Sequence, residues 1–337
     1  MRNIYDLTIK ELEDYFISIN EKKFRAVQVY EALYKRRIKS FDDMTNISKE
    51  VREKLKQDFS FYKIKMLIKQ QGKNVNKYLF ELEDGNKIES VLMFHDYGTS
   101  ICVSSQVGCN RTCAFCESGR LKKVRNLLAY EIVQQILQIE EDINKRITHV
   151  VLMGIGEPFD NYDNVLRFVK IINCGKGIDI GSRHITISTC GVIPGIKKFM
   201  NEEGQVNLAI SLHAPNDTLR SRIMPINKAY PLNELMETIK EYINKTNRRV
   251  TFEYIMLDNV NDSEENAKEL ALLLKGINCY VNLIPYNETE NIEFKRTKEW
   301  KIMKFYDILK KNKINVTIRK EFGGSVDAAC GQLRANN

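Results

Sequence analysis

The segment from Cys109 to Cys116 carries three thiols in a C-x3-C-x2-C pattern, contributed by Cys109, Cys113 and Cys116. Thiolates so close together on one short loop are typical ligands of an iron–sulfur cluster. Three protein ligands for a four-iron cluster leave one iron open, and an open iron can bind and activate a small molecule. The spacing therefore predicts a catalytic cluster rather than one that only carries electrons.

Two other uses of clustered cysteines fit this chain less well. Zinc sites usually combine two C-x2-C pairs or add nearby histidines. The sequence has no second pair, and none of its four histidines lies within a few residues of the loop. A disulfide scaffold is not expected in 337 residues with eight cysteines and no secretory signal. We therefore expect a protein of the reducing cytoplasm that holds an iron–sulfur cluster.

The elements that must position this loop follow an alternating pattern. Strands are predicted at 101–104, 149–154, 184–189, 207–213, 249–257, 280–286 and 315–319. Helices are predicted between them, near 128–142, 162–172, 194–202, 217–223, 231–245, 263–275 and 298–312. This alternation indicates parallel strands in a full or partial α/β barrel, or equally in a doubly wound sheet. Ligands bind at the carboxyl ends of the strands in both folds, and the cysteine loop follows the first strand.

Three parts are predicted along the chain: a helical module at 1–60, a β-hairpin extension at 61–94, and a core at 95–337. Thr8 and Glu11 fit a capping box at the start of a helix. Asp84-Gly85 separates two alternating runs, which is a strong hairpin signal. The helical module is either a nucleic-acid-docking unit or a packing cap.

Charge and hydropathy narrow the function only a little. The 52 Lys and Arg against 44 Asp and Glu give a net charge of +8, a mild surplus. Part of it gathers beside the cysteines, at Arg111, Arg120, Lys122, Lys123 and Arg125. This charge either attracts nucleic acid or marks a solvated loop. No apolar run approaches the ~18 residues of a membrane span.

Polar residues also follow the later strands. Gly154 and Gly156 permit close backbone approach to a ligand, and Glu157 adds an acceptor for an amino group. The further strand-end residues are Ser188, Ser211, Leu212, His213 and Asn287. Each alone is more often a turn or capping residue, but together they line one rim. The other cysteines at 174, 190 and 279 match no motif and are expected to be packing residues.

Seven motifs together make the sequence resemble the radical S-adenosylmethionine (SAM) superfamily and, within it, the RlmN/Cfr family of RNA adenine methyltransferases. The motifs are CVSSQVGC at 102–109, GIGEP at 154–158, SLHAPND at 211–217, MPIN at 224–227, YIMLD at 254–258, VND at 260–262 and DAACGQL at 327–333. The resemblance implies an α/β fold, a radical SAM partial (βα)6-type barrel with a helical N-terminal module and a β-hairpin extension. It also implies a [4Fe-4S] cluster with one open iron and two SAM molecules per turnover.

The resemblance implies a role for individual residues. Cys330 takes a methyl group from a first SAM, and a second SAM, cleaved at the cluster, yields the radical that activates this methyl group. The activated carbon adds to adenine and joins RNA to the protein through Cys330. Glu89 then accepts the ring proton, and Cys102 attacks the sulfur of Cys330, forming a disulfide and releasing methylated RNA. The residues implied to bind SAM are Gly156, Glu157, Ser188, Ser211, Leu212, His213 and Asn287.

The implied activity is methylation of adenine carbon 2 in 23S ribosomal RNA and possibly transfer RNA, with flavodoxin or ferredoxin as electron donor and no membrane partner. Two alternatives stay open: the carbon-8 branch, which confers antibiotic resistance, and a cluster-bearing RNA-binding relative without catalysis. The chain departs from the usual family pattern after Cys116. Glu117 adds a charge, and Lys122 and Lys123 stand where a glycine and an apolar residue are expected.

Overall fold

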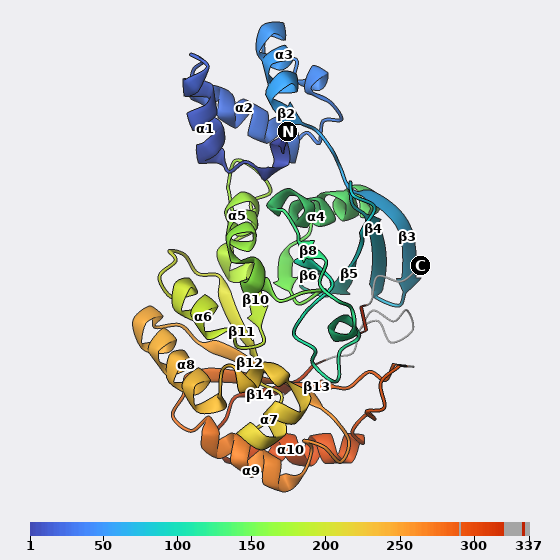
Figure 1. The fold of residues 1–337 in the computed structure, drawn as a ribbon, viewed down its shortest axis with the longest axis vertical. Helices are drawn as coiled ribbons and strands as arrows, with labels where there is room; N and C mark the ends of the chain where they lie inside the picture. Colours follow the sequence, from blue (N-terminus) through green and yellow to red (C-terminus); the bar gives the residue numbers. More distant parts are fainter. Residues whose placement is uncertain (290, 320–331, 334–337) are drawn as a thin grey trace.

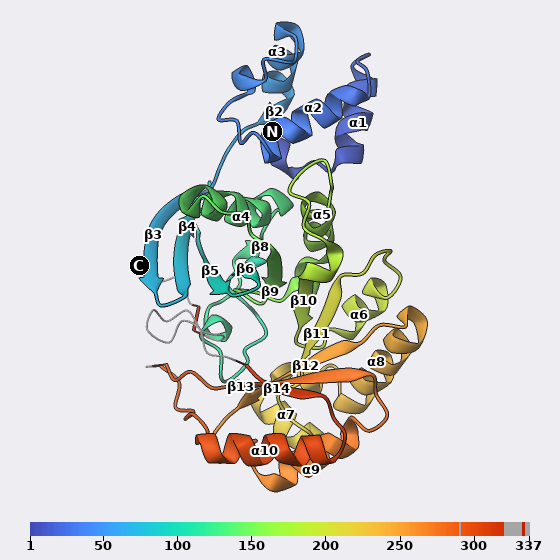
Figure 2. The same ribbon diagram turned by 180° about the vertical axis from the view of Figure 1, so that it is seen from behind.

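The computed structural model describes residues 1–289, 291–319 and 332–333. Its main sheet has ten strands, of which seven consecutive ones are parallel (Figures 1 and 2). These strands are β6 (Gly98–Cys102), β9 (His149–Leu152), β10 (Ile185–Thr189), β11 (Asn207–Ser211), β12 (Val250–Met256), β13 (Cys279–Pro285) and β14 (Val316–Ile318). They lie side by side in their order along the chain. The predicted strands are therefore confirmed, with ends shifted by a few residues.

Helices connect each parallel strand to the next. They are α4 (Ala129–Ile143), α5 (Tyr162–Ile172), α6 (Ile193–Phe199), α7 (Asp217–Ile223) with α8 (Leu232–Thr246), α9 (Glu264–Leu273) and α10 (Glu299–Lys311). Because the strand order never reverses, right-handed crossovers put all these helices on one face of the sheet. Within the described residues, β14 pairs only with β13, so the strands do not close into a complete barrel. The expected partial (βα)6-type barrel is confirmed, and the doubly wound alternative is excluded.

Three antiparallel strands extend this sheet beyond β6. They are β3 (Lys65–Gly72), β4 (Val75–Glu81) and β5 (Lys87–His95). The predicted hairpin joins β4 to β5, and Gly85 has the positive φ of 79° that its turn requires. Strand β5 pairs with β6 in turn, so the hairpin is continuous with the core sheet.

The N-terminal segment forms a helical unit beside α4 and α5 (Figure 1). Its helices are α1 (Ile9–Ser18), α2 (Phe24–Tyr34) and α3 (Lys49–Asp58), and its short strands β1 (Arg2–Asn3) and β2 (Phe59–Ser60) pair in parallel. The predicted capping box is present, with Thr8 and Glu11 exchanging hydrogen bonds. Arg167 of α5 donates to the Glu11 carboxylate at 2.5 Å, which ties this unit to the barrel.

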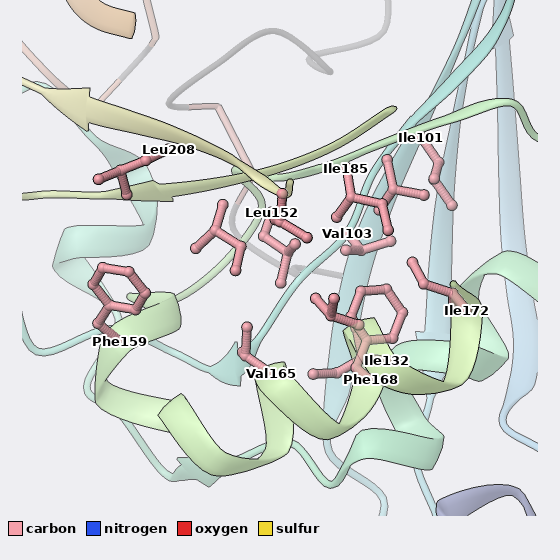
Figure 3. Packing of buried hydrophobic residues seen from close by; sticks show 14 of the residues in the cluster. Ile101, Val103, Ile132, Leu152, Phe159, Val165, Phe168, Ile172, Ile185 and Leu208 are labelled. Carbon is pink, nitrogen blue, oxygen red and sulfur yellow. The ribbon is translucent and has the colours of Figure 1, made fainter. Parts of the chain in front are cut away.

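Apolar side chains fill the space between the sheet and its helices. On α5, Val165, Phe168 and Ile172 recur at helical spacing and face the strands. Figure 3 shows them packed with Ile101 and Leu152 of the neighbouring strands β6 and β9. Burial of this apolar area holds the helices on the sheet and fixes the strand ends that carry the site. None of the helices in the described residues is long and apolar enough to cross a membrane.

A buried polar contact joins α4 to the chain that leaves β6. Gln135 accepts from the Ser104 backbone N–H at 2.8 Å and from the Ser90 hydroxyl at 2.6 Å, and donates to the Ser104 carbonyl at 3.0 Å. All three residues are almost completely buried. A polar group buried without a partner costs free energy, so this side chain fixes where the cysteine loop begins.

We expect Gln135→Ala to lower the free energy of unfolding by about 2–4 kcal/mol, because buried groups of Ser90 and Ser104 lose their partner. Denaturant unfolding measures this change. Gln138→Ala, a truncation of a partly exposed residue on the same helix, should stay within about 0.5 kcal/mol of wild type. Equal effects of the two substitutions would contradict the role given to Gln135.

Candidate active site

The cysteine loop is closed at its base by two short strands. Strand β7 (Gln106–Val107) pairs antiparallel with β8 (Arg125–Asn126), and the loop runs between them. The Cys109 N–H donates to the Leu121 carbonyl at 3.0 Å. Gly108 has a φ of 72°, and a Cβ there would lie 2.2 Å from the Lys122 carbonyl oxygen. The loop closes this tightly only with glycine at that position.

The three cysteines line one pocket together with residues at the carboxyl ends of β9–β12. Five of the residues expected to bind SAM also line it: Gly156, Glu157, Ser188, Ser211 and His213. Two others do not. Leu212 is fully buried in the apolar core, and Asn287, just beyond β13, donates to the Pro285 carbonyl at 3.5 Å. The strand ends thus bring most of this predicted set to the cysteines.

The two glycines after β9 lie close against residues of the chain that leaves β6. A Cβ at Gly154 would lie 2.7 Å from the carbonyl carbon of Val103. Gly156 has a φ of 107°, and a Cβ there would lie 2.6 Å from the Gln106 Cβ. The sequence predicted that these glycines let a ligand come close to the backbone. In the structure, the segment that comes close to them is the chain that leaves β6. Gly156 also lines the pocket.

Glu157 is buried and held from two sides. Its carboxylate accepts from the Cys190 N–H at 2.8 Å and the Phe159 N–H at 3.0 Å, and its own N–H donates to the Gln106 side chain at 2.9 Å. Burial raises the pKa of Glu157 above its ordinary value. Each carboxylate oxygen can accept more than one hydrogen bond, so Glu157 can still accept from an amino group in the pocket.

His213 is a neutral imidazole at the pocket wall. Its backbone has a φ of 57°, and its Nδ1 accepts from the Ile255 N–H at 3.0 Å, which leaves the proton on Nε2. Burial and the nearby Arg220 guanidinium lower its pKa to about 3. Its ring packs edge-to-face on Phe115 of the cysteine loop at 4.8 Å between centroids. His213 therefore positions the loop against β12.

Arg220 of α7 is a fully buried cation that the sequence analysis missed. Its guanidinium donates to the Cys190 carbonyl at 2.7 Å, the Leu212 carbonyl at 3.2 Å and the Asn227 side chain at 2.9 Å. Burial lowers its pKa, but the group stays charged at neutral pH. It joins the loops after β10 and β11, and its positive charge lies beside the thiols of Cys113 and Cys190.

Most of the arginines near the cysteine loop are paired within the protein. Arg111 forms an ion pair with Asp160, and Arg125 contacts the carboxylates of both Glu131 and Asp84. Arg120 donates to the Asn291 carbonyl at 2.7 Å. The structure therefore adds a third role for these arginines, which is to hold neighbouring segments together. Their main effect is to hold the loop and the β4–β5 turn in place.

Cys102 and Glu89 lie outside the residues that line the cysteine pocket. Cys102 ends β6 and belongs to a small buried apolar cluster that includes Ile155 and Leu333, and Met153, which packs on that cluster, also lines the pocket. Glu89, in the hairpin strand β5, is only 2% exposed. Cys330 lies outside the described residues.

The C-terminal segment reaches this region. The Ser118 hydroxyl, within the cysteine loop, donates to the Leu333 carbonyl at 2.6 Å, and the Gln332 side chain donates to the Glu288 carbonyl at 3.2 Å. Leu333 is three positions after Cys330 in the sequence. Leu333 is thus fastened to the loop that carries the pocket cysteines.

Cys190 lies in the pocket itself. It is buried, and burial together with the nearby Glu157 carboxylate raises the pKa of its thiol. The sequence analysis predicted only a packing role for Cys190. It missed the place of Cys190 in the pocket, because no sequence pattern indicated that the turn after β10 faces the cysteine loop. Cys279 and Cys174 pack on the main core as expected.

The donor set fits an iron–sulfur cluster better than a single metal ion. Cys109, Cys113 and Cys116 line one pocket, yet no three His, Cys, Asp or Glu side chains among the described residues converge closely enough to share one ion. The cysteines of a cluster each bind a different iron, so they need not converge. Burial raises the pKa of the thiols of Cys109 and Cys113, a cost that binding to iron removes.

Comparisons with known proteins agree with this fold and donor set. The radical SAM superfamily profile matches residues 103–271, and a profile described as the ribosomal RNA large subunit methyltransferase N-terminal domain matches residues 2–60. The crystal structure of a radical SAM methyltransferase from Sphaerobacter thermophilus has a TM-score of 0.94 and 41% identity, with 100% of both chains covered. The chain is therefore a radical SAM protein, a class that uses SAM and a [4Fe-4S] cluster.

Full-length relatives identify the family. A protein of Spiroplasma citri named "Probable dual-specificity RNA methyltransferase RlmN" is 53% identical over 341 residues, covering 100% of this chain and 98% of that protein. A protein of the same name from Enterococcus faecalis is 54% identical over 342 residues, covering 99% and 96%. The chain belongs to the RlmN family.

We expect Cys113→Ala to abolish cluster assembly, because the cluster loses one of three thiolate ligands. Iron and sulfide analysis of protein purified without oxygen, together with its absorbance spectrum, measures the loss. Cys190→Ala and Cys279→Ala should both keep their iron and sulfide. Loss of iron in Cys190→Ala would instead make Cys190 a fourth ligand.

We expect protonation of His213 to contribute to acid unfolding. The unfolded chain takes up this proton near pH 6.5 and the folded chain only at about pH 3, so the stability from His213 is lost as pH falls through this range. His213→Asn keeps an acceptor and tolerates the positive φ. Its unfolding free energy, from urea titrations at several pH values, should fall less steeply than that of wild type by about 1.4 kcal/mol per pH unit. Parallel curves would contradict this assignment.

Proposed function

We propose that this protein methylates carbon 2 of an adenine in RNA, using a methyl group carried on Cys330. The observation that carries the proposal is the meeting of a three-cysteine pocket with the carboxyl ends of β9–β12 in a chain whose relatives are named dual-specificity RNA methyltransferases. An adenine C–H carbon is a poor nucleophile, so direct methyl transfer from SAM does not suffice. A radical route avoids this limit.

Three thiolates from Cys109, Cys113 and Cys116 would hold the cluster and leave one iron without a protein ligand. When bound, the cluster supplies the single electron that cleaves SAM. Glu157 and Ser211 line the same pocket and offer acceptors for the amino group of SAM. Arg220 and His213 hold the surrounding loops, and the buried Arg220 charge favours anionic groups nearby. Asn287 would contribute to SAM binding from the rim of the pocket. Leu212 would contribute from behind the pocket wall.

The later steps would use residues beside the pocket. Two SAM molecules are consumed in each turnover, one to methylate Cys330 and one to activate that methyl group. Glu89 would accept the proton from the ring carbon, and the Cys102 thiolate would attack the Cys330 sulfur to free the RNA. Support comes from the burial of Cys102 in one cluster with Leu333, three residues after Cys330.

The proposed substrates are 23S ribosomal RNA and transfer RNA, as the term dual-specificity in the relatives' names suggests. The electron donor would be a flavodoxin or ferredoxin, and the reaction would take place in the cytoplasm. The N-terminal unit, which matches a ribosomal RNA methyltransferase domain, is the proposed accessory part for RNA docking.

We expect Cys330→Ala to lose all RNA methylation while it retains the cluster and reductive cleavage of SAM. The physical reason is that the variant keeps the pocket but lacks the thiol that carries the methyl group. Mass spectrometry of nucleosides from treated RNA measures methylation, and 5′-deoxyadenosine formation measures SAM cleavage. Cys174→Ala, a cysteine remote from the pocket, serves as the matched control.

The same nucleoside analysis tests the position of the methyl group. Wild-type protein should yield 2-methyladenosine. A product of 8-methyladenosine would replace the proposal with the carbon-8 reaction. Methylation by Cys330→Ala would rule out the route through a methylated cysteine, and no methylation by wild type with an intact cluster would favour a non-catalytic RNA-binding protein.

A further inference from the structure

The cysteine loop has one face toward the pocket and one face toward solvent. Its odd-numbered residues line the pocket, and they are Cys109, Arg111, Cys113 and Phe115. The residues between them are exposed and do not line the pocket, and they are Asn110, Thr112 and Ala114. We call these three residues the outer face of the loop. A single stretch of backbone thus separates the pocket thiols from solvent on this side.

Neighbouring segments bring positive charge to both ends of the outer face. At one end, the Lys123 N–H donates to the Asn110 side-chain oxygen at 3.0 Å. At the other end, the Ala114 N–H donates to the Ile223 carbonyl at 2.9 Å, and Arg222 directly precedes this residue on α7. The outer face itself carries no charged side chain. It is therefore a small neutral surface with cations beside it.

The cations beside the outer face are Lys122, Lys123 and Arg222, which we call the outer cations. Lys122 and Arg222 are exposed, and Lys123 is half-buried. Among the residues that the structure describes, no carboxylate forms an ion pair with any of them. The nearby carboxylates of Asp160 and Glu131 are already paired with arginines of the loop. The positive charge of the outer cations is therefore available to an acidic partner.

The position of this surface favours an electron carrier over RNA as the partner. A target adenine must enter the pocket, and the residues proposed to act on it, Cys102 and Glu89, belong to strands β6 and β5. A molecule on the outer face is instead on the solvent side of the loop. Electron transfer weakens steeply with distance, and here one layer of backbone lies between that molecule and the thiols of Cys109 and Cys113.

We propose that the outer face and the outer cations form the docking surface for an acidic one-electron carrier protein that reduces the cluster. This inference rests on the proposed function, in which the cluster supplies an electron to SAM. One electron leaves the carrier, which is oxidised, and enters the cluster, which is reduced. No proton moves and no covalent bond changes. Redox partners use small interfaces of under about 1,200 Å², and charge complementarity speeds their encounter.

The test compares wild type with two triple variants, K122Q/K123Q/R222Q and K310Q/K311Q/K313Q. The first removes the outer cations. The second is the matched control, because it removes the same number of positive charges from exposed lysines at the end of α10. Helix α10 leads into β14, which is parallel to β13, so its end lies at the edge of the sheet opposite the pocket.

Stopped-flow absorbance without oxygen follows reduction of the cluster by reduced flavodoxin and, separately, by reduced ferredoxin. At low salt the outer-cation variant should be reduced about 10-fold to 100-fold more slowly than wild type by at least one carrier. This gap should shrink toward 1 M salt, where the Debye length is about 3 Å. The control variant should react like wild type. Photoreduced deazariboflavin, which is small and uncharged, should reduce all three proteins equally.

Binding measurements give a readout that is independent of catalysis. Calorimetry with the oxidised carrier should show about 10-fold weaker binding to the outer-cation variant than to wild type or control. Filter binding should show unchanged affinity for transfer RNA. Loss of RNA affinity with unchanged reduction by both carriers would assign this surface to RNA and overturn the inference. Equal losses for carrier and RNA would mean general attraction of polyanions and would also overturn it.

The remaining outcomes separate this inference from the proposed function. If wild type makes 2-methyladenosine and both carriers reduce the outer-cation variant as fast as wild type, only the inference fails. If carriers reduce wild type faster than the variant but no 2-methyladenosine forms, only the proposed function fails. A wild-type protein that assembles no cluster would end both.

Iron content and unfolding midpoints are measured for every variant. If the outer-cation variant loses its iron, the single variants K122Q and R222Q replace it, and each should be reduced about 3-fold more slowly than wild type. Loss of iron in both single variants would assign these cations to folding of the loop and overturn the inference.

Discussion

Close packing between the chain that leaves β6 and the chain that leaves β9 is the constraint on which the pocket depends. Backbone groups of Ser105 and Gln106 donate to the Ile155 carbonyl, and the Gln106 side chain receives the Glu157 N–H. Gly154 allows this approach because any side chain there would meet backbone. The cysteine loop starts from one of these segments and Glu157 belongs to the other, so their separation sets the geometry of the site.

Buried charge is distributed around this contact in an ordered way. Arg220 lies beside the thiols, Glu157 is held by backbone N–H groups, and Lys77 faces Glu89 on the neighbouring part of the sheet. Each group has a partner of opposite charge or several hydrogen-bond partners, as buried charges require. The pocket therefore combines ionic groups with an apolar interior without leaving these charges unsatisfied.

Local patterns in the sequence were sufficient for the alternating elements, the capping box and the cysteine loop. Periodicity does not encode the order of strands, so the open barrel and the doubly wound sheet had equal support until pairing was known. Strand β3 was missed because Lys69, Gln70 and Gln71 interrupt its alternation. The role of Arg220 was hidden because its partners are carbonyls from loops distant in sequence, and the burial of Glu89 depends on the strands on both sides.

The order of strands in the sheet has a consequence for synthesis of the chain. Each strand from β3 to β14 joins the edge left by the preceding strand of the sheet, so the sheet can grow as the polypeptide emerges from the ribosome. Leu333 behaves differently, because it docks on Ser118, 215 positions earlier. A nascent chain can therefore assemble its scaffold early, yet Leu333 can reach Ser118 only after every strand of the sheet has been synthesised.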